Sequence, residues 1–456
     1  MNASKGAMGR DRFASSLGAF AATVGSAIGL GNIWKFPYLT GSNGGAAFVV
    51  AYLLCVALVG IPVMVAEHAI GRRTRMNAVQ AYATVVPRQR GWTAIGWGGF
   101  AAAILIMAFY TDVAGWVFAY VFKSIRAFAL GGVLGPADFA AIAGGTVEPL
   151  AWQLGVLALA CFIVASGVSK GIERATRTLM PVLFILLVVC DLRALSLPGS
   201  LAGVNYLFRP DLAKLSAPVL LSALGLAFFK LSLGMGTMTT YGSYLPDSTR
   251  ILPNATRVAL ADTAVSLLAG LAIFPTVFAF GGTPAGGPGL LFNTIPLVFS
   301  KMPAGGLFTA LFFILTSVAT IGAMVSLIEV PVAWLTERRR LSRPAAAAAT
   351  GAAMFALGSL ATLSQGPTLS GVRVFGKSFF DLFDFASSNV LLPLGGLAIA
   401  IVAGWLLARP EFMSELDKGF GARPWHSRLV VSFVKFVAPV LILLILLNSL
   451  GLLRLS

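Results

Sequence analysis

Two long apolar stretches of this chain are each interrupted by glycines. The first contains Gly25, Gly29 and Gly31, and the second contains Gly234 and Gly236. Glycine tolerates non-helical backbone, so each stretch can unwind inside a membrane and turn free N–H and C=O groups toward a ligand. A matched pair of broken membrane helices indicates the binding site of a transporter that is built from inverted repeats.

The composition indicates a polytopic membrane protein. Of the 456 residues, 57% are hydrophobic and 11% are charged, and the mean hydropathy is +0.87. A soluble protein of this size has too little interior for so much apolar surface. Cys55, Cys161 and Cys190 all fall in apolar runs, which favours packing over disulfide or metal chemistry. No small-residue cleavage site follows the first apolar run, so we expect no removed signal peptide.

Apolar segments of roughly 20 or more residues predict eleven membrane spans. They cover about 15–38, 43–71, 92–126, 150–168, 176–196, 215–245, 255–281, 305–336, 345–363, 379–407 and 428–453. Most Lys and Arg residues fall in loops on the side of the N-terminus, which predicts a cytoplasmic N-terminus and an external C-terminus. The net charge of +16 is then a cytoplasmic collar, and nucleic-acid binding is disfavoured because no basic soluble segment exists to carry it.

Motifs spread over the chain carry a family resemblance. They are Gly18-to-Pro37, Gly41-to-Ala46, Glu67-to-Arg72, Tyr110-to-Trp116, Gly171-to-Pro181, Ser232-to-Gly236, Ser326-to-Glu329 and Asp381-to-Phe385. With these motifs the chain resembles the neurotransmitter:sodium symporter family, in its bacterial amino-acid transporter branch. The resemblance implies an all-α polytopic protein of the bacterial inner membrane with the leucine-transporter fold, whose helices 1 and 6 are broken. The implied units are a cytoplasmic segment 1–14, inverted five-helix repeats 15–196 and 215–407, and an eleventh helix 428–453.

The resemblance implies a central substrate site between the broken helices. Unwound backbone at Ala27, Gly29, Leu30 and Gly31 would hold the carboxylate and amine of the substrate. Monoamine carriers have an aspartate at the position of Gly29, so glycine there implies a substrate with its own carboxylate, an amino acid. The matching side-chain positions are mainly apolar and predict an apolar substrate: Ser26, Ile106, Tyr110, Phe229, Ser232, Met235, Ala323 and Leu327. Ile106 and Leu327 fit an ordinary apolar core equally well.

The first sodium position departs from the family pattern. By resemblance its ligands match Ala27, Asn32, Lys230 and Asp262, where the family has a hydroxyl at position 230 and an asparagine at position 262. An ammonium cannot coordinate sodium and would occupy the place of the cation. Lys230 is therefore predicted to replace the first sodium ion beside the substrate.

The second sodium and the chloride positions also lack ligands. The vestigial positions of the second sodium site are Gly25, Ile28, Ala319, Gly322 and Ala323. Side-chain hydroxyls are missing at Gly322 and Ala323. Of the chloride positions, which match Leu226, Lys230 and Ser266, only the last keeps its hydroxyl. We therefore expect no chloride, no other metal and no cofactor.

A lysine at the centre of a membrane helix costs roughly 2.5–3.5 kcal/mol on insertion scales, so Lys230 is expected to pair with Asp262 on the facing helix. Three interpretations remain open. The pair is a permanent structural replacement for sodium, or sodium couples through the degraded second site. In the third, which we favour, Lys230 is a titratable amine, and transport is sodium-independent and either proton-coupled or an exchange.

The resemblance also implies gates on both sides of the site. The residues that match the outer gate are Lys35, Asp384, Tyr110 and Phe229. Those that match the inner gate are Arg10, Phe13, Tyr244 and Glu337. Each charged residue among them also fits a solvated loop position. Glu67 and Glu329 are expected to bond backbone near the helix breaks, and Asp112 and Asp191 are left without a role.

Other function classes fit less well. An intramembrane enzyme needs a Ser–His or paired-Asp arrangement at depth, and the sequence offers neither. A channel needs a selectivity filter, and no repeated filter segment occurs. A sensor that binds an amino acid without transporting it would use the same site and stays open, as do the identity of the amino acid and any oligomeric state. The expected partners are an amino acid and the lipid bilayer.

Overall fold

Helices account for nearly all of the regular structure in the part of the chain that is described. The computed structural model describes residues 11–282, 287–407, 409–418 and 424–453. Within these residues the only departure from helices, turns and irregular backbone is one isolated β-bridge between Val374 and Lys377. This architecture agrees with the all-α class that the apolar segments predict.

The helices of the first half are α1 Ser16–Ala27, α2 Phe36–Ser42, α3 Ala46–Cys55, α4 Ile61–Thr74, α5 Ala78–Val85, α6 Thr93–Leu130, α7 Pro136–Ala143, α8 Val147–Ala165, α9 Arg174–Leu195 and α10 Ser200–Phe208. Those of the second half are α11 Ala217–Lys230, α12 Thr237–Tyr244, α13 Ile251–Ala279, α14 Thr294–Ser300, α15 Gly305–Arg339, α16 Arg343–Leu363, α17 Phe379–Asp384, α18 Leu392–Ile401, α19 Arg409–Asp417, α20 Pro424–Ser432 and α21 Ala438–Ser449. Short π-helical segments join several of them at Gly31–Lys35, Val56–Gly60, Val168–Glu173, Phe385–Leu391, Val402–Leu406 and Phe433–Val437. Single 3₁₀ turns occupy Arg90–Trp92, Leu212–Lys214 and Gly287–Leu290.

Nine continuous helices among the described residues are long and apolar enough to cross a membrane, and the bent pair of α1 with Gly31–Ser42 makes a tenth. The remaining predicted span, 215–245, corresponds to α11 and α12, which have 14 and 8 residues and are separated by the second glycine-containing break. The multi-pass architecture is therefore clear, while the count of eleven spans stays a prediction.

The first break follows Ala27. Ile28 leaves the helix with extended backbone (φ −84°, ψ 115°), the helix resumes at Gly31, and its two parts are bent by 49°. The second break is a tighter turn, because Ser232, Gly234 and Gly236 all have positive φ, at 54°, 75° and 77°. Glycine adopts this backbone without strain, whereas the serine does not.

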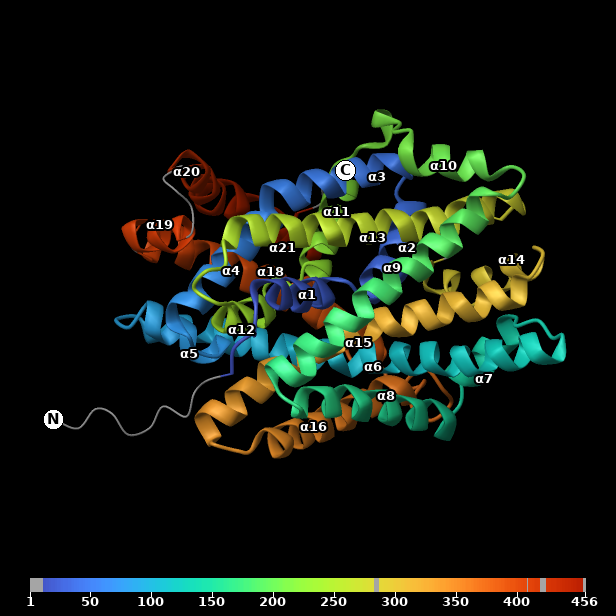
Figure 1. Cartoon of the computed structure of the whole chain (residues 1–456), viewed down its shortest axis with the longest axis horizontal. Coiled ribbons are helices and arrows are strands. Elements are labelled where there is room, and N and C mark those ends of the chain that lie inside the picture. Colours follow the sequence, from blue (N-terminus) through green and yellow to red (C-terminus); the bar gives the residue numbers. More distant parts are fainter. Residues whose placement is uncertain (1–10, 283–286, 408, 419–423, 454–456) are drawn as a thin grey trace.

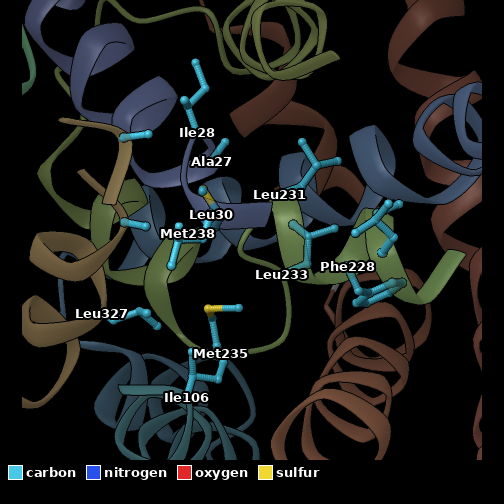
Figure 2. Close-up of a cluster of buried hydrophobic side chains, with 14 of the residues drawn as sticks. Ala27, Ile28, Leu30, Ile106, Phe228, Leu231, Leu233, Met235, Met238 and Leu327 are labelled. Carbon is cyan, nitrogen blue, oxygen red and sulfur yellow. The ribbon is translucent and has the colours of Figure 1, made fainter. Parts of the chain in front are cut away.

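The two breaks meet at the centre of the bundle. The Ser232 hydroxyl donates to the backbone carbonyl of Ser26 at 3.0 Å, and the Ser26 hydroxyl donates to Ser326 of α15 at 2.9 Å. Figure 1 shows α1 and α12 near the middle of the molecule, with the long helices α6 and α15 beside them. Figure 2 shows apolar side chains from both breaks gathered into one cluster with Ile106 and Leu327. The broken segments therefore lie where a ligand would be enclosed on all sides.

Candidate functional site

A small cavity of about 20 Å³ lies between the two breaks. Its lining residues are Ser26, Ala27, Gly29, Gly31, Ile106, Tyr110, Phe229, Lys230, Ser232, Met235, Ala323 and Leu327. These are all the predicted substrate residues except Leu30, which is buried next to them and donates its backbone N–H to the Tyr110 hydroxyl at 3.0 Å. The structure brings the set together, and its role in substrate binding stays a prediction.

Gly29 lines this cavity at a crowded position. A Cβ atom at position 29 would lie 2.8 Å from the Tyr110 hydroxyl and 2.9 Å from the Ala323 Cβ. Distances this short force neighbouring atoms to move. An aspartate at this position, as in monoamine carriers, would therefore not fit the cavity as it stands.

Lys230 and Asp262 form an ion pair beside the cavity. The Nζ atom lies 3.1 Å from Asp262 Oδ2, and both side chains are 0% exposed. Tyr52 accepts a hydrogen bond from Lys230 at 2.9 Å and donates one to Asp262 at 2.8 Å. Ser266 accepts a third bond from the ammonium. Each of the three ammonium hydrogens therefore has an acceptor, which is the condition under which a buried charge is tolerated.

Asn32 connects this ion pair to the first break. Its side-chain amide donates to Asp262 Oδ1 at 2.7 Å and to the Ser266 hydroxyl at 3.0 Å. Its carbonyl oxygen accepts the backbone N–H of Gly29 at 3.1 Å. The pair is also flanked by aromatic rings, because Nζ lies 4.9 Å from the centroid of Phe36 and 4.4 Å from that of Tyr52. The predicted replacement residues Lys230, Asp262 and Asn32 thus form one connected network.

Tyr52 is a member of this network that the sequence reasoning missed. It lies on α3, is 0% exposed, and touches both charges. A tyrosine in an apolar membrane segment needs a hydrogen-bond partner, so its position was a usable signal. The spacing along the chain does not say which partner it finds.

The helices also approach closely at the vestigial positions of the second sodium. A Cβ atom on Gly322 would lie 2.5 Å from the carbonyl oxygen of Gly25. The small residue therefore lets α15 pack directly against α1, and a hydroxyl-bearing side chain would need the two helices to separate. Ala319 and Ala323 are buried on the same helix.

A larger cavity of about 700 Å³, here called the vestibule, adjoins the central cavity at Phe229. Lys35 Nζ lies 2.9 Å from Asp384 Oδ1 on its wall, with side chains 17% and 35% exposed. Phe229 is the residue that lines both this vestibule and the central cavity, and Lys35 Nζ lies 4.0 Å above its ring. Three of the predicted outer-gate residues, Lys35, Asp384 and Phe229, thus lie together at the vestibule, while Tyr110 lies below, in the central cavity.

The side of the bundle at Phe13 and Tyr244 is closed by aromatic packing and a buried carboxylate. Phe13 meets the rings of Tyr241 and Tyr244 edge-on, at centroid distances of 5.6 and 5.9 Å. The Tyr244 hydroxyl donates to Glu329 at 2.7 Å, and Arg343 lies 2.5 Å from the other oxygen of Glu329. The predicted inner-gate residues Phe13 and Tyr244 are therefore in contact, on the side opposite the vestibule.

The remaining predicted residues have mixed outcomes. Glu67 accepts the backbone N–H groups of Gly234 and Thr239, at 2.8 and 3.2 Å, so its expected role beside the second break is confirmed. The expectation of hydrogen bonds to backbone was wrong for Glu329, because the side chains of Tyr244 and Arg343 occupy its two carboxylate oxygens.

Four further charged residues were singled out in the sequence. Glu337 accepts hydrogen bonds from the backbone and side chain of Asn77, at 3.0 and 2.7 Å. Arg10, the last predicted inner-gate residue, lies outside the described residues. Asp112 and Asp191 are buried on α6 and α9 and line neither the central cavity nor the vestibule.

The sequence profile of the Sodium:neurotransmitter symporter family matches residues 10–130 and 143–454. The chain belongs to this family. It is 40% identical over 448 residues to YhdH of Bacillus subtilis (strain 168), which is named an uncharacterized sodium-dependent transporter, covering 97% of this chain and 98% of the relative. A sodium-dependent transporter of Haemophilus influenzae is 33% identical over 455 residues, with 97% and 98% covered.

A solved structure of the same family has the same fold. The crystal structure of MhsT in complex with L-phenylalanine is 41% identical in sequence to this chain and superimposes with a TM-score of 0.88, covering 97% of this chain and 100% of MhsT. The predicted family and fold class are therefore confirmed, and the chain is a multi-pass membrane protein of a transporter family.

Proposed function

We propose that this symporter-family protein carries apolar amino acids by alternating access and does so without sodium. Lys230 supplies the positive charge that a first sodium ion supplies in the family pattern. The coupling is then either to protons that Lys230 binds and releases, or to a counter-moving amino acid. We further propose that the N-terminus is cytoplasmic in a bacterial inner membrane, and that repeats 15–196 and 215–407 move relative to each other.

The substrate class rests on Gly29 and on the apolar cavity wall. Gly29 leaves no room for a carboxylate from the protein, so an amine-bearing substrate must bring its own to the N–H groups at the break. Ile106, Met235 and Leu327 supply apolar surface for its side chain. MhsT, which shares the fold, was crystallised with L-phenylalanine, and this supports a large apolar substrate here. The cavity of about 20 Å³ must widen to admit it.

The network around Lys230 is the observation that carries the ion-coupling proposal. Its ammonium is held by Asp262, Tyr52 and Ser266, with 0% exposure of either charged side chain. A sodium ion has no place among these oxygens while the ammonium occupies them, because the two like charges would repel at contact distance in a medium of low dielectric constant.

Sodium symport through the second site is the competing function, and the names of the relatives from B. subtilis and H. influenzae favour it. Against it stands the contact of α1 with α15. The carbonyl oxygen of Gly25 lies 2.5 Å from where a Cβ atom on residue 322 would stand, and the family pattern has a hydroxyl-bearing side chain at this position. Only backbone oxygens remain there as ligands, and a hard cation such as sodium is held poorly by so few oxygens.

Uptake into proteoliposomes tests the proposal. Radiolabelled L-phenylalanine and L-leucine are offered in sodium-free potassium buffer to vesicles with an alkaline interior, to vesicles without a gradient, and to vesicles preloaded with the same amino acid. We expect uptake without sodium. Stimulation by the pH gradient identifies proton coupling, and stimulation only by preloading identifies exchange.

Two results would overturn it. Uptake that requires an inward sodium gradient at every pH would restore the sodium symport reading. Saturable binding of the amino acid, seen as a rise in melting temperature, together with no flux under any gradient would identify a sensor. Empty liposomes and protein denatured before reconstitution are the controls.

A further inference from the structure

A groove on the outside of the helix bundle lies far from the substrate path. It has a volume of about 510 Å³ and runs between α8 and α16, which lie side by side along one edge of the molecule in Figure 1. Its walls are apolar side chains such as Leu154, Leu157, Phe162 and Phe355, and its floor is made of small residues that include Gly351. The helices crossing here are membrane spans, so lipid is the solvent that this groove meets.

The length of the groove corresponds to one leaflet. It extends along α8 from Leu154 to Ala165 and along α16 from Phe355 to Pro344. At 1.5 Å per helical residue this is roughly 16 Å, and half of a hydrocarbon core is about 15 Å. A volume of about 510 Å³ over that length gives a cross-section of roughly 30 Å². That section suits a single extended hydrocarbon chain, while a helix of 10 Å diameter needs about 80 Å².

Positive charge gathers at one end of the groove only. Pro344 follows a segment with arginines at 338, 339, 340 and 343, and the chain beyond Ala165 carries Lys170. Lys170, Arg338 and Arg340 are exposed. Arg343 is committed to Glu329 and to the carbonyl oxygen of Val164, at 2.5 and 2.9 Å. A half-buried acidic residue in this region, Glu337, bonds Asn77.

We propose that this groove is a binding site for an anionic phospholipid. One acyl chain lies between α8 and α16, and the phosphate lies at the cations around the start of α16. Basic pockets between membrane helices on the cytoplasmic side are a recognised setting for anionic lipid headgroups, and each nearby Lys or Arg strengthens the binding roughly fivefold. A lipid held there contacts the segment through which Arg343 joins α8, α15 and Asp11, so it would stiffen the cytoplasmic end of the bundle.

Photocrosslinking tests this proposal on the full chain in lipid nanodiscs. Phosphatidylglycerol and phosphatidylcholine that carry the same diazirine-labelled acyl chain are incorporated in turn, and adducts are mapped by mass spectrometry. We expect adducts on residues 154–165 and 344–355, at least fivefold more from phosphatidylglycerol than from phosphatidylcholine. Ala348→Phe should remove most of them, because Ala348 lines the groove.

Matched variants test whether labelling depends on the shape of the groove and on the cations at its end, and not on general effects of substitution. Ala349 is exposed one residue further along α16 and does not line the groove, so Ala349→Phe should leave labelling unchanged. Lys170→Gln with Arg338→Gln should abolish the preference for phosphatidylglycerol, whereas Arg88→Gln with Arg257→Gln, exposed elsewhere, should preserve it. Equal labelling by both lipids, or adducts spread evenly over all apolar faces, would overturn the proposal. So would a crosslink between two chains through α8 and α16, which would make the groove a contact between copies.

Discussion

Two lysine–aspartate pairs of nearly equal length lie near Phe229, since Lys35 Nζ lies 4.0 Å above its ring and Lys230 is the next residue in the chain. Lys230 and Asp262 are 3.1 Å apart with both side chains 0% exposed, whereas Lys35 and Asp384 are 2.9 Å apart with side chains 17% and 35% exposed. The buried pair has Tyr52 as an additional partner of both charges, while the exposed pair borders a cavity of about 700 Å³. The two ion pairs are nearly equal in length, but they differ in how deeply their side chains are buried.

The comparison shows what burial does to the cost of breaking a pair. Water replaces a lost partner at the vestibule, so the exposed pair can open and close in each transport cycle. No water replaces a partner around Lys230, so a lost partner there leaves an uncompensated charge. The exposed pair, Lys35 and Asp384, is suited to gating. The buried pair, Lys230 and Asp262, is suited to joining the two helices that carry it.

Removing the buried lysine should have the largest effect. In Lys230→Ala the Asp262 carboxylate keeps Tyr52 and Asn32 but loses its counter-charge, and breaking a buried pair in this way costs about 3–5 kcal/mol. We expect a clearly lower melting temperature of the purified protein and no further rise when L-phenylalanine is added. Lys230→Ala with Asp262→Ala should recover part of the lost stability. Full stability in the single variant would show that the two charges are not coupled.

Removing the Tyr52 hydroxyl should have an intermediate effect. Tyr52→Phe takes one acceptor from the ammonium and one donor from Asp262, and an unsatisfied buried group costs about 1–3 kcal/mol. The melting temperature and the rate of amino-acid uptake should both fall. Tyr206→Phe is the matched control, because Tyr206 makes a part-buried hydrogen bond of 2.9 Å to the Gly41 carbonyl away from any charge. If Tyr206→Phe lowers the melting temperature and the uptake rate as much as Tyr52→Phe does, then the contact of Tyr52 with the two charges has no special effect.

Converting the buried pair to the family pattern should change the ion dependence. Lys230→Thr with Asp262→Asn removes both charges and places two neutral oxygens near Asn32, as sodium requires. We expect sodium to stimulate binding about tenfold, or ~1.4 kcal/mol, in this variant. Thermal shift with L-phenylalanine in sodium and in potassium measures it, with the unchanged protein as control. If sodium stimulates binding to the unchanged protein by the same factor, then the buried pair does not determine the ion dependence.

Breaking the exposed pair should have the smallest effect on stability. Lys35→Ala removes an ion pair open to the vestibule, and such pairs contribute about 0–1 kcal/mol and are screened by salt. The melting temperature should hardly change at high salt, while Lys35→Arg should behave like the unchanged protein at all salt concentrations. A loss as large as that of Lys230→Ala would mean that the outer pair is structural and not a gate.

The sequence predicted those parts of the site that depend on local rules. The glycine breaks follow from backbone freedom, and the pairing of Lys230 with Asp262 follows from the cost of a lone charge in a membrane. The partners of Tyr52 and of Glu329 were not predictable, because they depend on which side chains on distant helices come within reach. The approach of Gly322 to Gly25 depends in the same way on how α1 and α15 pack.

The buried pair has an electrical consequence for the transport cycle. Lys230 and Asp262 sum to zero charge, and an amino acid in its zwitterionic form adds none. A site that is reoriented in this state moves no charge through the membrane field, where each elementary charge is worth about 2.3 kcal/mol per 100 mV. Uptake by exchange should then be indifferent to membrane voltage. Proton-coupled uptake should respond to voltage only in the step at which the site returns empty, with its amine deprotonated.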